Sequence, residues 1–308
     1  MSFHIGPQVA YAEPIERLAR YFAVPDSRQA SLARTELARP ASDDAERRSA
    51  LVEALAGEVR ADGSLAGGAL PTIWRAHELM DLGVRPAAPS LGRLLIWITR
   101  RHAIAGAYGE GCGGDRHQRR VCEHFIHGFF SPAPPEQRIA PITMPNGKVF
   151  RQEPAARFAM SCLAFRALAR AGEGARPLMR KHADTLLELQ GQWTEWDGYF
   201  APDLIVAGLH ALTMIDSPAA RSATARVAEL VAARQGIDGE WPRADLFHVA
   251  EALLAAGTSD ARAALRRAAP AFEARQRIDG SFGSTARDER ALIGLRALLV
   301  AHRELLGG

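Results

Sequence analysis

Cysteine and long uncharged stretches are scarce in this chain. Only three of its 308 residues are cysteines, an odd number that does not suggest a disulfide framework. No uncharged stretch approaches the roughly 18 residues of a membrane-spanning helix, and residues 1–10 lack the charged start and apolar run of a signal peptide. We therefore expect a cytoplasmic protein with no transmembrane segment.

An excess of one charge is also lacking. The 38 basic residues are balanced by 35 acidic ones, and the basic residues are mostly arginines scattered along predicted helices. This balance predicts no nucleic-acid groove and no basic patch for a membrane surface. With 47% hydrophobic residues, the chain is long enough for a large core and is expected to form one cooperative body.

A short phrase recurs six times along the chain: a glycine two residues before a bulky residue, usually preceded by Asp. The copies centre on Gly63, Gly106, Gly147, Gly198, Gly239 and Gly280. The steps between these glycines are 43, 41, 51, 41 and 41 residues, so one unit is repeated. Repetition at this period predicts a solenoid or a closed ring, because each unit buries its apolar face against its neighbours.

The segments that flank each phrase have helical periodicity, so the unit is a helix, a glycine turn and a second helix. One helix of each pair is amphipathic and the other is apolar nearly all round, which indicates an outer and an inner layer. Outer helices are expected at residues 47–60, 88–101, 174–190, 219–235 and 260–276. Inner helices are expected at residues 70–82, 115–130, 154–171, 202–215, 244–256 and 287–305.

Two segments depart from this pattern. A helix near residues 13–22 is followed by residues 25–46, which are rich in Ser, Ala, Arg and Asp and are interpreted as a mobile linker. The chain is therefore divided into an N-terminal helix and linker, residues 1–46, and a repeat domain, residues 47–308. The third outer helix is expected to be replaced by an ordered loop, because residues 131–145 carry five prolines.

Two copies of the phrase carry a family resemblance. Gln235 to Trp241 and Gln276 to Phe282 resemble the Gln-and-Trp repeat of the terpenoid cyclase and protein prenyltransferase toroids, and the likeness extends over residues 47–305. Earlier copies are eroded, with Val59 and Thr194 where the later copies have Gln. The resemblance implies an all-α fold, an (α/α)6 toroid or double-layered helical barrel. In the phrase itself, glycine permits the turn and the aromatic residue fills the gap between hairpins.

Proteins of that superfamily usually bind an isoprenoid in the central cavity. The resemblance implies that a cyclase would protonate an alkene with an Asp-x-Asp-Asp motif, which this sequence lacks. Asp43-Asp44 lies in the expected linker and is interpreted as a solvated pair. Carboxylates at the starts of inner helices are interpreted as helix caps: Asp115, Asp203, Asp245 and Asp288. Asp245 is the strongest exception as a catalytic acid, with Glu123 and His248 as further catalytic candidates.

Residues 110–127 hold the densest polar chemistry. In protein prenyltransferases the corresponding inner helix is similar to Gly-Arg-x-x-Lys-x-x-Asp-x-Cys-Tyr, where Arg and Lys hold the diphosphate and Asp and Cys bind zinc. Arg116 and Arg119 fall at the two basic positions, Cys122 and His124 at the two ligand positions, and Phe125 at the Tyr. The resemblance therefore implies a diphosphate site at the arginines, and Cys and His are competent zinc ligands.

A third zinc ligand of that family lies in an Asp-x-Tyr-His phrase, which Asp245-Leu246-Phe247-His248 resembles. In a ring of six, the Cys122 and His248 helices would face each other. With neighbouring axes about 8 to 10 Å apart, their axes would be roughly 16 to 20 Å apart, too far to share one ion. Cys162 on the adjacent inner helix, Cys112 or His127 could complete the site instead.

Two interpretations of the same residues need no metal. In one, Cys122 and Cys162 are small buried hydrophobic residues and the nearby histidines are hydrogen-bonded core or rim residues. In the other, the arginines of residues 116–120 hold a phosphate or carboxylate beside the Gly-rich residues 109–114.

Aromatic residues on the inner helices are the candidate lining of the cavity: Trp74, Phe125, Phe129, Phe158, Phe165 and Phe247. Their faces could stabilise a cationic intermediate, although an aromatic content of 7% is low for a carbocation cyclase.

Three functions are consistent with these residues. The first is a toroid enzyme that binds an isoprenoid-like apolar substrate, with or without a diphosphate, and performs prenyl transfer or cyclisation. The second is a catalytically silent toroid that binds a hydrophobic ligand. The third is the toroid subunit of a heteromeric complex with a helical-repeat protein partner. Bound zinc would favour transfer.

Overall fold

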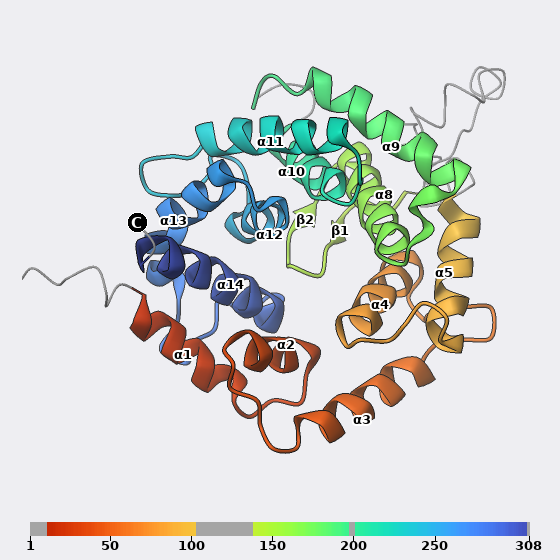
Figure 1. Ribbon diagram of the computed structural model, residues 1–308, viewed down its shortest axis with the longest axis horizontal. Helices are drawn as coiled ribbons and strands as arrows, with labels where there is room; N and C mark the ends of the chain where they lie inside the picture. The colour runs from red at the N-terminus through yellow and green to blue at the C-terminus, as the bar shows by residue number, and fades with distance from the viewer. Residues whose placement is uncertain (1–10, 103–137, 197–200, 307–308) are drawn as a thin grey trace, which may run out of the picture. The chain divides into compact units, whose positions relative to one another are not determined.

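The structure is a computed structural model that describes residues 11–102, 138–196 and 201–306. Almost all regular structure in these residues is α-helical, so the expected all-α class is confirmed (Figure 1). The chain folds as two compact units. Unit 1 comprises residues 1–48, 145–148 and 225–308, and unit 2 comprises residues 49–144 and 149–224.

Unit 1 consists of N-terminal and C-terminal helices. Its complete helices are α1 (Ala12–Phe22), α2 (Arg28–Glu36), α12 (Leu246–Ala256), α13 (Ser259–Arg275) and α14 (Arg287–Leu306). Helix α14 packs against the other four, as Figure 1 shows for this unit. Helices α3 (Asp44–Gly57) and α11 (Pro218–Ala233) each have one end in this unit.

Unit 2 contains the middle of the chain. Its helices are α4 (Ala69–Asp81), α5 (Pro89–His102), α8 (Glu153–Arg170), α9 (Pro177–Leu189) and α10 (Ala201–Leu212), with short 3-10 turns η4 (Glu173–Ala175) and η5 (Gln190–Gln192). Two short strands, β1 (Ile142–Thr143) and β2 (Val149–Phe150), pair antiparallel. Helix α8 is central, because it packs against α4, α5, α9 and α10.

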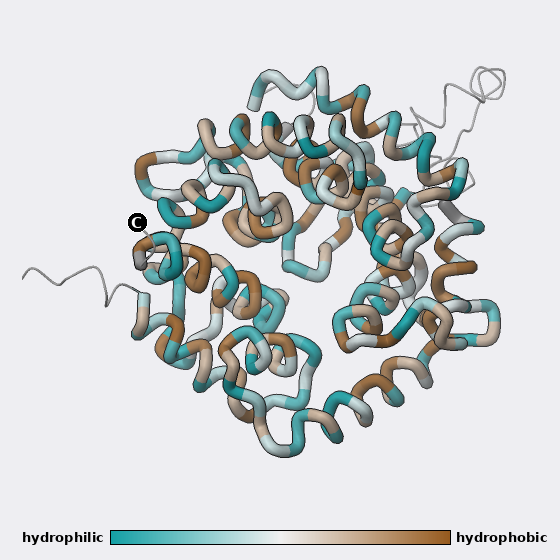
Figure 2. Tube along the Cα trace, viewed as in Figure 1, coloured by the Kyte–Doolittle hydropathy of each residue, from teal (hydrophilic) through white to brown (hydrophobic). Residues whose placement is uncertain are grey.

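The expected helices are present throughout the described residues, with ends that differ by a few positions. The exception is the inner helix expected at residues 115–130, which lies outside them. The contrast between amphipathic and apolar helices also holds. Helix α11 buries Ala220, Val227 and Val231 along one face, whereas α12 buries most of its residues, and α10 and α12 are drawn mainly in the hydrophobic colour of Figure 2.

The glycine of each described phrase has the same backbone conformation. Gly63, Gly147, Gly239 and Gly280 have φ between 82° and 89°, a left-handed region that favours glycine. A Cβ on Gly239 would lie 2.5 Å from the carbonyl oxygen of Arg267 on α13, so this turn also lacks room for a side chain. The copies at Gly106 and Gly198 lie outside the described residues.

The Asp or Asn before each glycine has a structural role. Its side-chain oxygen accepts a hydrogen bond from the backbone N–H two residues later, which is an Asx turn. The donor–acceptor distances are 2.9 Å at Asp62, 3.0 Å at Asn146, 3.0 Å at Asp238 and 2.9 Å at Asp279. The recurring Asp is therefore explained by the turn.

The bulky residue after the glycine fills the space between helices, as the sequence predicts. Trp241 is 2% exposed, and its indole N–H donates to the carbonyl oxygen of Val231 over 2.8 Å. Phe282 is equally buried and packs so closely on α14 that a Cβ on Gly294 would lie 2.5 Å from its ring. The aromatic residue and the facing glycine thus form a matched pair.

Helix α1 occupies the position of an outer helix beside the last turn. In the preceding repeat, the Gln235 side-chain amide donates to the carbonyl oxygen of Ala264 on α13 over 3.0 Å. In the last repeat, Gln276 makes the same bond, also 3.0 Å, to Pro14 on α1. A Cβ on Gly280 would lie 2.6 Å from a backbone carbonyl oxygen of α1, much as a Cβ on Gly239 would from one of α13. The N-terminal helix therefore continues the repeat array.

The interpretation of residues 25–46 as a linker is wrong over much of its length. Residues 28–36 form α2, which Ser27 caps by accepting a hydrogen bond from the N–H of Ala30. This helix buries Ala30 and Ala33 but also Arg28 and Arg34. Sequence patterning missed it because the buried face includes charged residues, which normally indicate solvent exposure.

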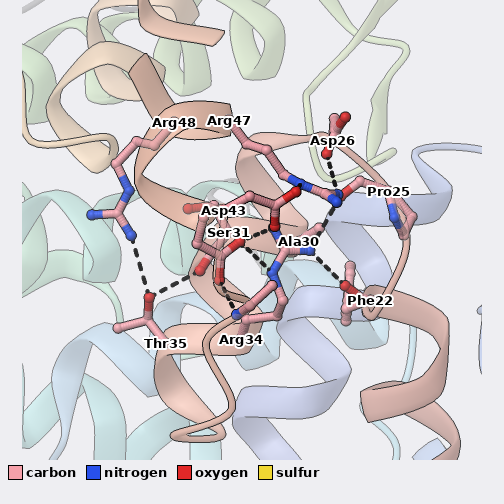
Figure 3. Close-up of polar contacts among 12 residues, drawn as sticks. Phe22, Pro25, Asp26, Ala30, Ser31, Arg34, Thr35, Asp43, Arg47 and Arg48 are labelled. Atoms are coloured by element: carbon pink, nitrogen blue, oxygen red, sulfur yellow. Dashed lines mark hydrogen bonds and ion pairs between the residues drawn. The ribbon is translucent and has the colours of Figure 1, made fainter. Parts of the chain in front are cut away.

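Arg34 connects α2 to the chain on either side of it (Figure 3). Its guanidinium donates to the carbonyl oxygens of Phe22 and Pro25 over 2.8 and 3.2 Å, and its Nε donates to Asp44 over 2.7 Å. This hydrogen bond lowers the pKa of Asp44. Asp43 pairs with Arg47 over 2.7 Å, but its side chain is 44% exposed, so it is solvated as expected. Asp44 departs from that expectation, because its side chain is only 13% exposed beside Arg34.

The described part of the expected proline-rich loop is not helical, as predicted. Residues 138–150 instead contain the hairpin of β1 and β2, in which Ile142 is opposite Phe150. The Glu153 carboxylate at the start of α8 accepts hydrogen bonds from the N–H groups of Ile139 and Ala140. No helix in the described residues is both long enough and apolar enough to cross a membrane.

Candidate functional site

A polar cluster interrupts the apolar interior of unit 1. It consists of Asn146, Asp245, His248, Glu251 and Arg290, and we call it the Asn146 cluster. Three of its members, Asp245, His248 and Glu251, follow one another at intervals of three residues from the N-cap to the middle of α12, so neighbouring members lie close together on that helix. The other two come from the turn of residues 145–148 and from α14.

Asn146 is the centre of the cluster. Its side-chain nitrogen lies 3.2 Å from Nδ1 of His248 and donates to the Glu251 carboxylate over 2.7 Å. The side-chain oxygen accepts from the N–H of Lys148, which fixes the orientation of the amide. Asn146 is only 5% exposed, and its contact with His248 is buried, whereas its bond to Glu251 is partly buried.

The amide sets the tautomer of His248. An amide nitrogen can only donate, so Nδ1 of His248 accepts and the neutral ring carries its proton on Nε2. His248 is 9% exposed. The cluster therefore holds a buried, oriented imidazole beside the carboxylate-bound amide of Asn146.

Arg290 joins the turn to the start of α12. Its Nε donates to the backbone carbonyl of Asn146 over 3.0 Å, and Nη2 pairs with Asp245 over 2.9 Å. A Cβ on Gly147 would lie 2.9 Å from Arg290 Nε, so the glycine also makes room for the guanidinium. The guanidinium carbon lies 4.8 Å from the centre of the Phe247 ring, within cation–π range.

Asp245 caps α12, as the sequence predicts. Oδ1 accepts from the N–H groups of Phe247 and His248 over 3.0 and 3.1 Å, while Oδ2 pairs with Arg290. Both oxygens are thus engaged with donors. Its role as a catalytic acid stays a prediction.

A buried ion pair lies next to the cluster on α14. Glu289, the neighbour of Arg290, pairs with Arg28 of α2, and Gln29 donates to the same oxygen over 3.0 Å. The side chains of Arg28 and Glu289 are 4% and 9% exposed. Burial raises the pKa of Glu289, opposed by the charge of Arg28 and reinforced by the charge of Glu251. The two carboxylates therefore influence each other electrostatically.

Several predicted site residues lie elsewhere in the structure. Phe247 is 4% exposed and packs against Phe272 and Phe282 with ring centroids 5.4 and 5.3 Å apart, so it belongs to the core of unit 1. Trp74, in unit 2, is half-buried beside His77, with ring centroids 5.7 Å apart. Binding of substrate by either aromatic residue stays a prediction.

Cys162 is buried in unit 2 on α8, as the interpretation without metal predicts. Burial raises the pKa of its thiol, which favours the protonated form. In residues 11–102, 138–196 and 201–306, no three His, Cys, Asp or Glu side chains are grouped to hold a metal ion.

The remaining candidates lie in residues 103–137, outside the described part of the chain. They are Arg116, Arg119, Cys122, Glu123, His124, Phe125 and Phe129. Their diphosphate, zinc, catalytic and lining roles stay predictions.

Sequence reasoning missed Asn146, Glu251 and Arg290. Asn146 is the one Asn among phrases that otherwise carry Asp before glycine, or Ala in the second copy. Glu251 is an acidic residue in the middle of an apolar helix. Both departures from the pattern are visible in the sequence, whereas the proximity of Arg290 depends on the packing of α14 against α12.

Together, the repeated turns and the helices define an all-α protein with helical repeats and a polar cluster beside the apolar helix α12. Comparison of the chain with protein-family models, curated proteins and solved structures gives no match.

Proposed function

We propose that this chain is an enzyme of the α/α-toroid type that acts on an isoprenoid-like apolar substrate, with the Asn146 cluster supplying its acid–base chemistry. One observation carries the proposal. The Asn146 amide binds both His248 and Glu251, two polar residues on a helix that is otherwise apolar.

The toroid arrangement is supported by the contacts of α1. An open array would leave the last turn without a following outer helix, but Gln276 and Gly280 contact α1 as Gln235 and Gly239 contact α13. The first helix beside the last repeat is what a closed ring requires. In this proposal, α1 and α2 form an additional helix pair beside the six expected from the glycine phrases.

The cost of the cluster supports a functional role. Burying an imidazole and an amide, with two carboxylates partly withdrawn from water beside them, is unfavourable unless the groups are paired. Hydrophobic residues of similar volume often stabilise as well or better. Perturbed and buried titratable groups are common at functional sites for this reason. The repeat geometry itself does not use His248 or Glu251, because the turns are closed by Asp or Asn and glycine.

The geometry supports acid–base chemistry at His248 better than at Asp245. Imidazole is the side chain whose ordinary titration lies near neutral pH, and Asn146 fixes its tautomer. Asp245 already accepts two N–H bonds and pairs with Arg290, which suits it to hold α12 and Arg290 in place. His248 is therefore the proposed proton donor or acceptor, and Asn146 a positioning residue.

Turnover of prenyl substrates tests this proposal. The full chain would be incubated with geranyl, farnesyl and geranylgeranyl diphosphate, and diphosphate release and products followed by mass spectrometry. We expect turnover that falls by about 100-fold or more in His248→Gln, the usual scale for loss of a general acid or base. His302→Gln, the same change on a different helix, α14, is the control and should retain turnover. Equal turnover in both variants would overturn the role of His248.

A second function is favoured by the contacts of Asp245, because both of its carboxylate oxygens are already bound by N–H groups of the protein. If the cluster is wholly structural, the chain binds an apolar ligand without converting it. This predicts thermal stabilisation by a prenyl alcohol with no product from any of the three diphosphates. If the chain shows no stabilisation and no product, both functions are contradicted.

A further inference from the structure

Two isoleucines in unit 1 are almost completely exposed. Ile237 and Ile278 are 108% and 95% exposed, far more than is usual for large apolar side chains. Each precedes the Asp of a glycine phrase, Asp238-Gly239 and Asp279-Gly280. They therefore occupy equivalent positions at the tips of successive repeats, which we call the isoleucine tips.

The turn does not require isoleucine at this position. In the first phrase the equivalent residue is Ala61, and the Asx turn of Asp62 and the positive φ of Gly63 are the same. Alanine is thus compatible with the turn, whereas isoleucine at the same position exposes a larger apolar surface to water. The exposure therefore recurs at equivalent positions one repeat apart without being required by the turn.

The isoleucine tips are adjacent in space. Glu240, three residues after Ile237, accepts a hydrogen bond over 2.7 Å from Arg275, three residues before Ile278. Gln235 also binds α13, the helix that leads into the second tip. The tips therefore form one edge of unit 1 rather than two unrelated loops.

Arginine surrounds both tips. Arg234 precedes Ile237 and Arg277 precedes Ile278, and both are exposed. Two of the acidic residues nearby pair with arginines: Glu240 with Arg275 and Asp279 with Arg287. Asp238 accepts the N–H of its own turn and keeps its charge. The edge thus combines separated apolar tips with exposed cationic side chains, although the net charge of the whole chain is only +3.

We propose that the isoleucine tips dock unit 1 on an anionic lipid surface. Isolated apolar side chains flanked by arginine can insert among lipid headgroups while the guanidinium groups bind phosphate. A protein interface would need a contiguous apolar core, which two single tips do not supply. The inference is independent of the proposed chemistry at His248.

Vesicle flotation tests the inference. The full chain would be mixed with vesicles of phosphatidylcholine, with and without phosphatidylglycerol, at low and high salt. We expect partition onto the anionic vesicles that weakens as salt screens the arginines. The Ile237→Ser, Ile278→Ser double variant should bind about tenfold or more weakly, as removal of two inserted apolar side chains predicts. Arg234→Gln with Arg277→Gln should reduce the anionic preference.

Ile96→Ser is the matched control, because Ile96 is an exposed isoleucine (54%) of unit 2 that belongs to neither tip. It should bind like the unmodified protein, as should His248→Gln, so failure of the proposed enzyme function would leave this result intact. Absence of partition onto either vesicle would overturn the inference, and so would unchanged binding of the double isoleucine variant. Circular dichroism would confirm that the variants are folded.

Discussion

The side-chain amide of Gln276 donates to the backbone carbonyl of Pro14, in the same way as Gln235 donates to Ala264 one repeat earlier. The same side chain also lies 3.3 Å from the carbonyl oxygen of Gly280, so Gln276, at the end of α13, binds both the turn and α1.

Replacing this glutamine should weaken unit 1. Gln276→Ala leaves the Pro14 carbonyl without its donor, and we expect a loss of about 1 to 2 kcal/mol in the free energy of unfolding, measured by urea denaturation. Gln235→Ala should cost a similar amount because its bonds are equivalent. A negligible loss for Gln276→Ala would contradict the equivalence of α1 and α13.

Glycine substitutions separate backbone strain from lack of space. Gly280 and Gly283 both have positive φ, but a Cβ on Gly280 would lie 2.6 Å from the Arg17 carbonyl oxygen, whereas Gly283 has nothing within 4 Å. Gly283→Ala should therefore cost about 1 kcal/mol, the ordinary penalty of a left-handed alanine. Gly280→Ala should cost clearly more, on the same denaturation assay. Equal costs would show that α1 can move away from the added Cβ without a measurable loss of stability.

The buried pair of Arg28 and Glu289 predicts a charge-specific effect. Arg28→Met leaves Glu289 buried without its partner and should destabilise by about 3 to 5 kcal/mol. The double variant Arg28→Met, Glu289→Met removes both charges and should recover much of that loss. The exposed pair Arg262–Glu304 is the control, and Arg262→Met should cost about 1 kcal/mol or less. A double variant no better than Arg28→Met would argue against a charge effect.

His77 in unit 2 should make stability depend on pH. Burial lowers the pKa of His77 to about 3, and the charges of Arg166 and Arg170 act in the same direction. Its Nε2 lies 3.0 Å from the Leu163 carbonyl oxygen and its Nδ1 lies 3.0 Å from Arg170, which suits a neutral ring.

The unfolded chain takes up a proton on this histidine as the pH falls below about 6.5, whereas the folded chain does not. Stability is therefore retained above about 6.5 and falls by up to about 1.4 kcal/mol for each pH unit below it, toward about 3. Urea midpoints between about pH 7 and pH 5 would measure the slope, which should be shallower in His77→Gln. An unchanged slope would exclude His77 as the source.

Asn146 should control the tautomer of His248. In the unmodified protein, nitrogen-15 NMR should show the proton of the neutral ring on Nε2. Asn146→Asp replaces the donor by a carboxylate that can only accept, so the proton should move to Nδ1 or the ring should become doubly protonated. Asn146→Ala removes the interaction without adding charge and serves as the comparison. The same spectrum in all three proteins would disprove the positioning role.

Periodicity is sufficient to predict most of the helices, because α10, α11 and α12 differ plainly in how apolar residues are spaced. The glycine turns can also be predicted from the sequence, since Asp238-Gly239 and Asp279-Gly280 recur at a fixed spacing. Helix α2 could not be predicted in this way. Arg28 is buried against Glu289, which is distant in sequence, and Arg34 is buried against backbone carbonyl groups of another segment.

The candidate site was predicted only in part. Asp245, Phe247 and His248 lie close together in sequence, and the structure places Asp245 and His248 in one cluster. Asn146 and Arg290 come from segments about one repeat or more away, and no local pattern indicates which of many polar residues will meet. Periodicity predicts which face of a helix is buried but not which residue of another helix it meets.

The bond between Gln276 and Pro14 also constrains how the protein acquires its fold. These residues are 262 positions apart, so during synthesis α1 emerges long before the turn that contacts it. Contacts this distant in sequence are slow to form, because a long loop must close first. Unit 2 is built from the middle of the chain and can become compact on the ribosome. Unit 1 is completed only when the final repeat has been synthesised, and until then the apolar face of α1 stays uncovered.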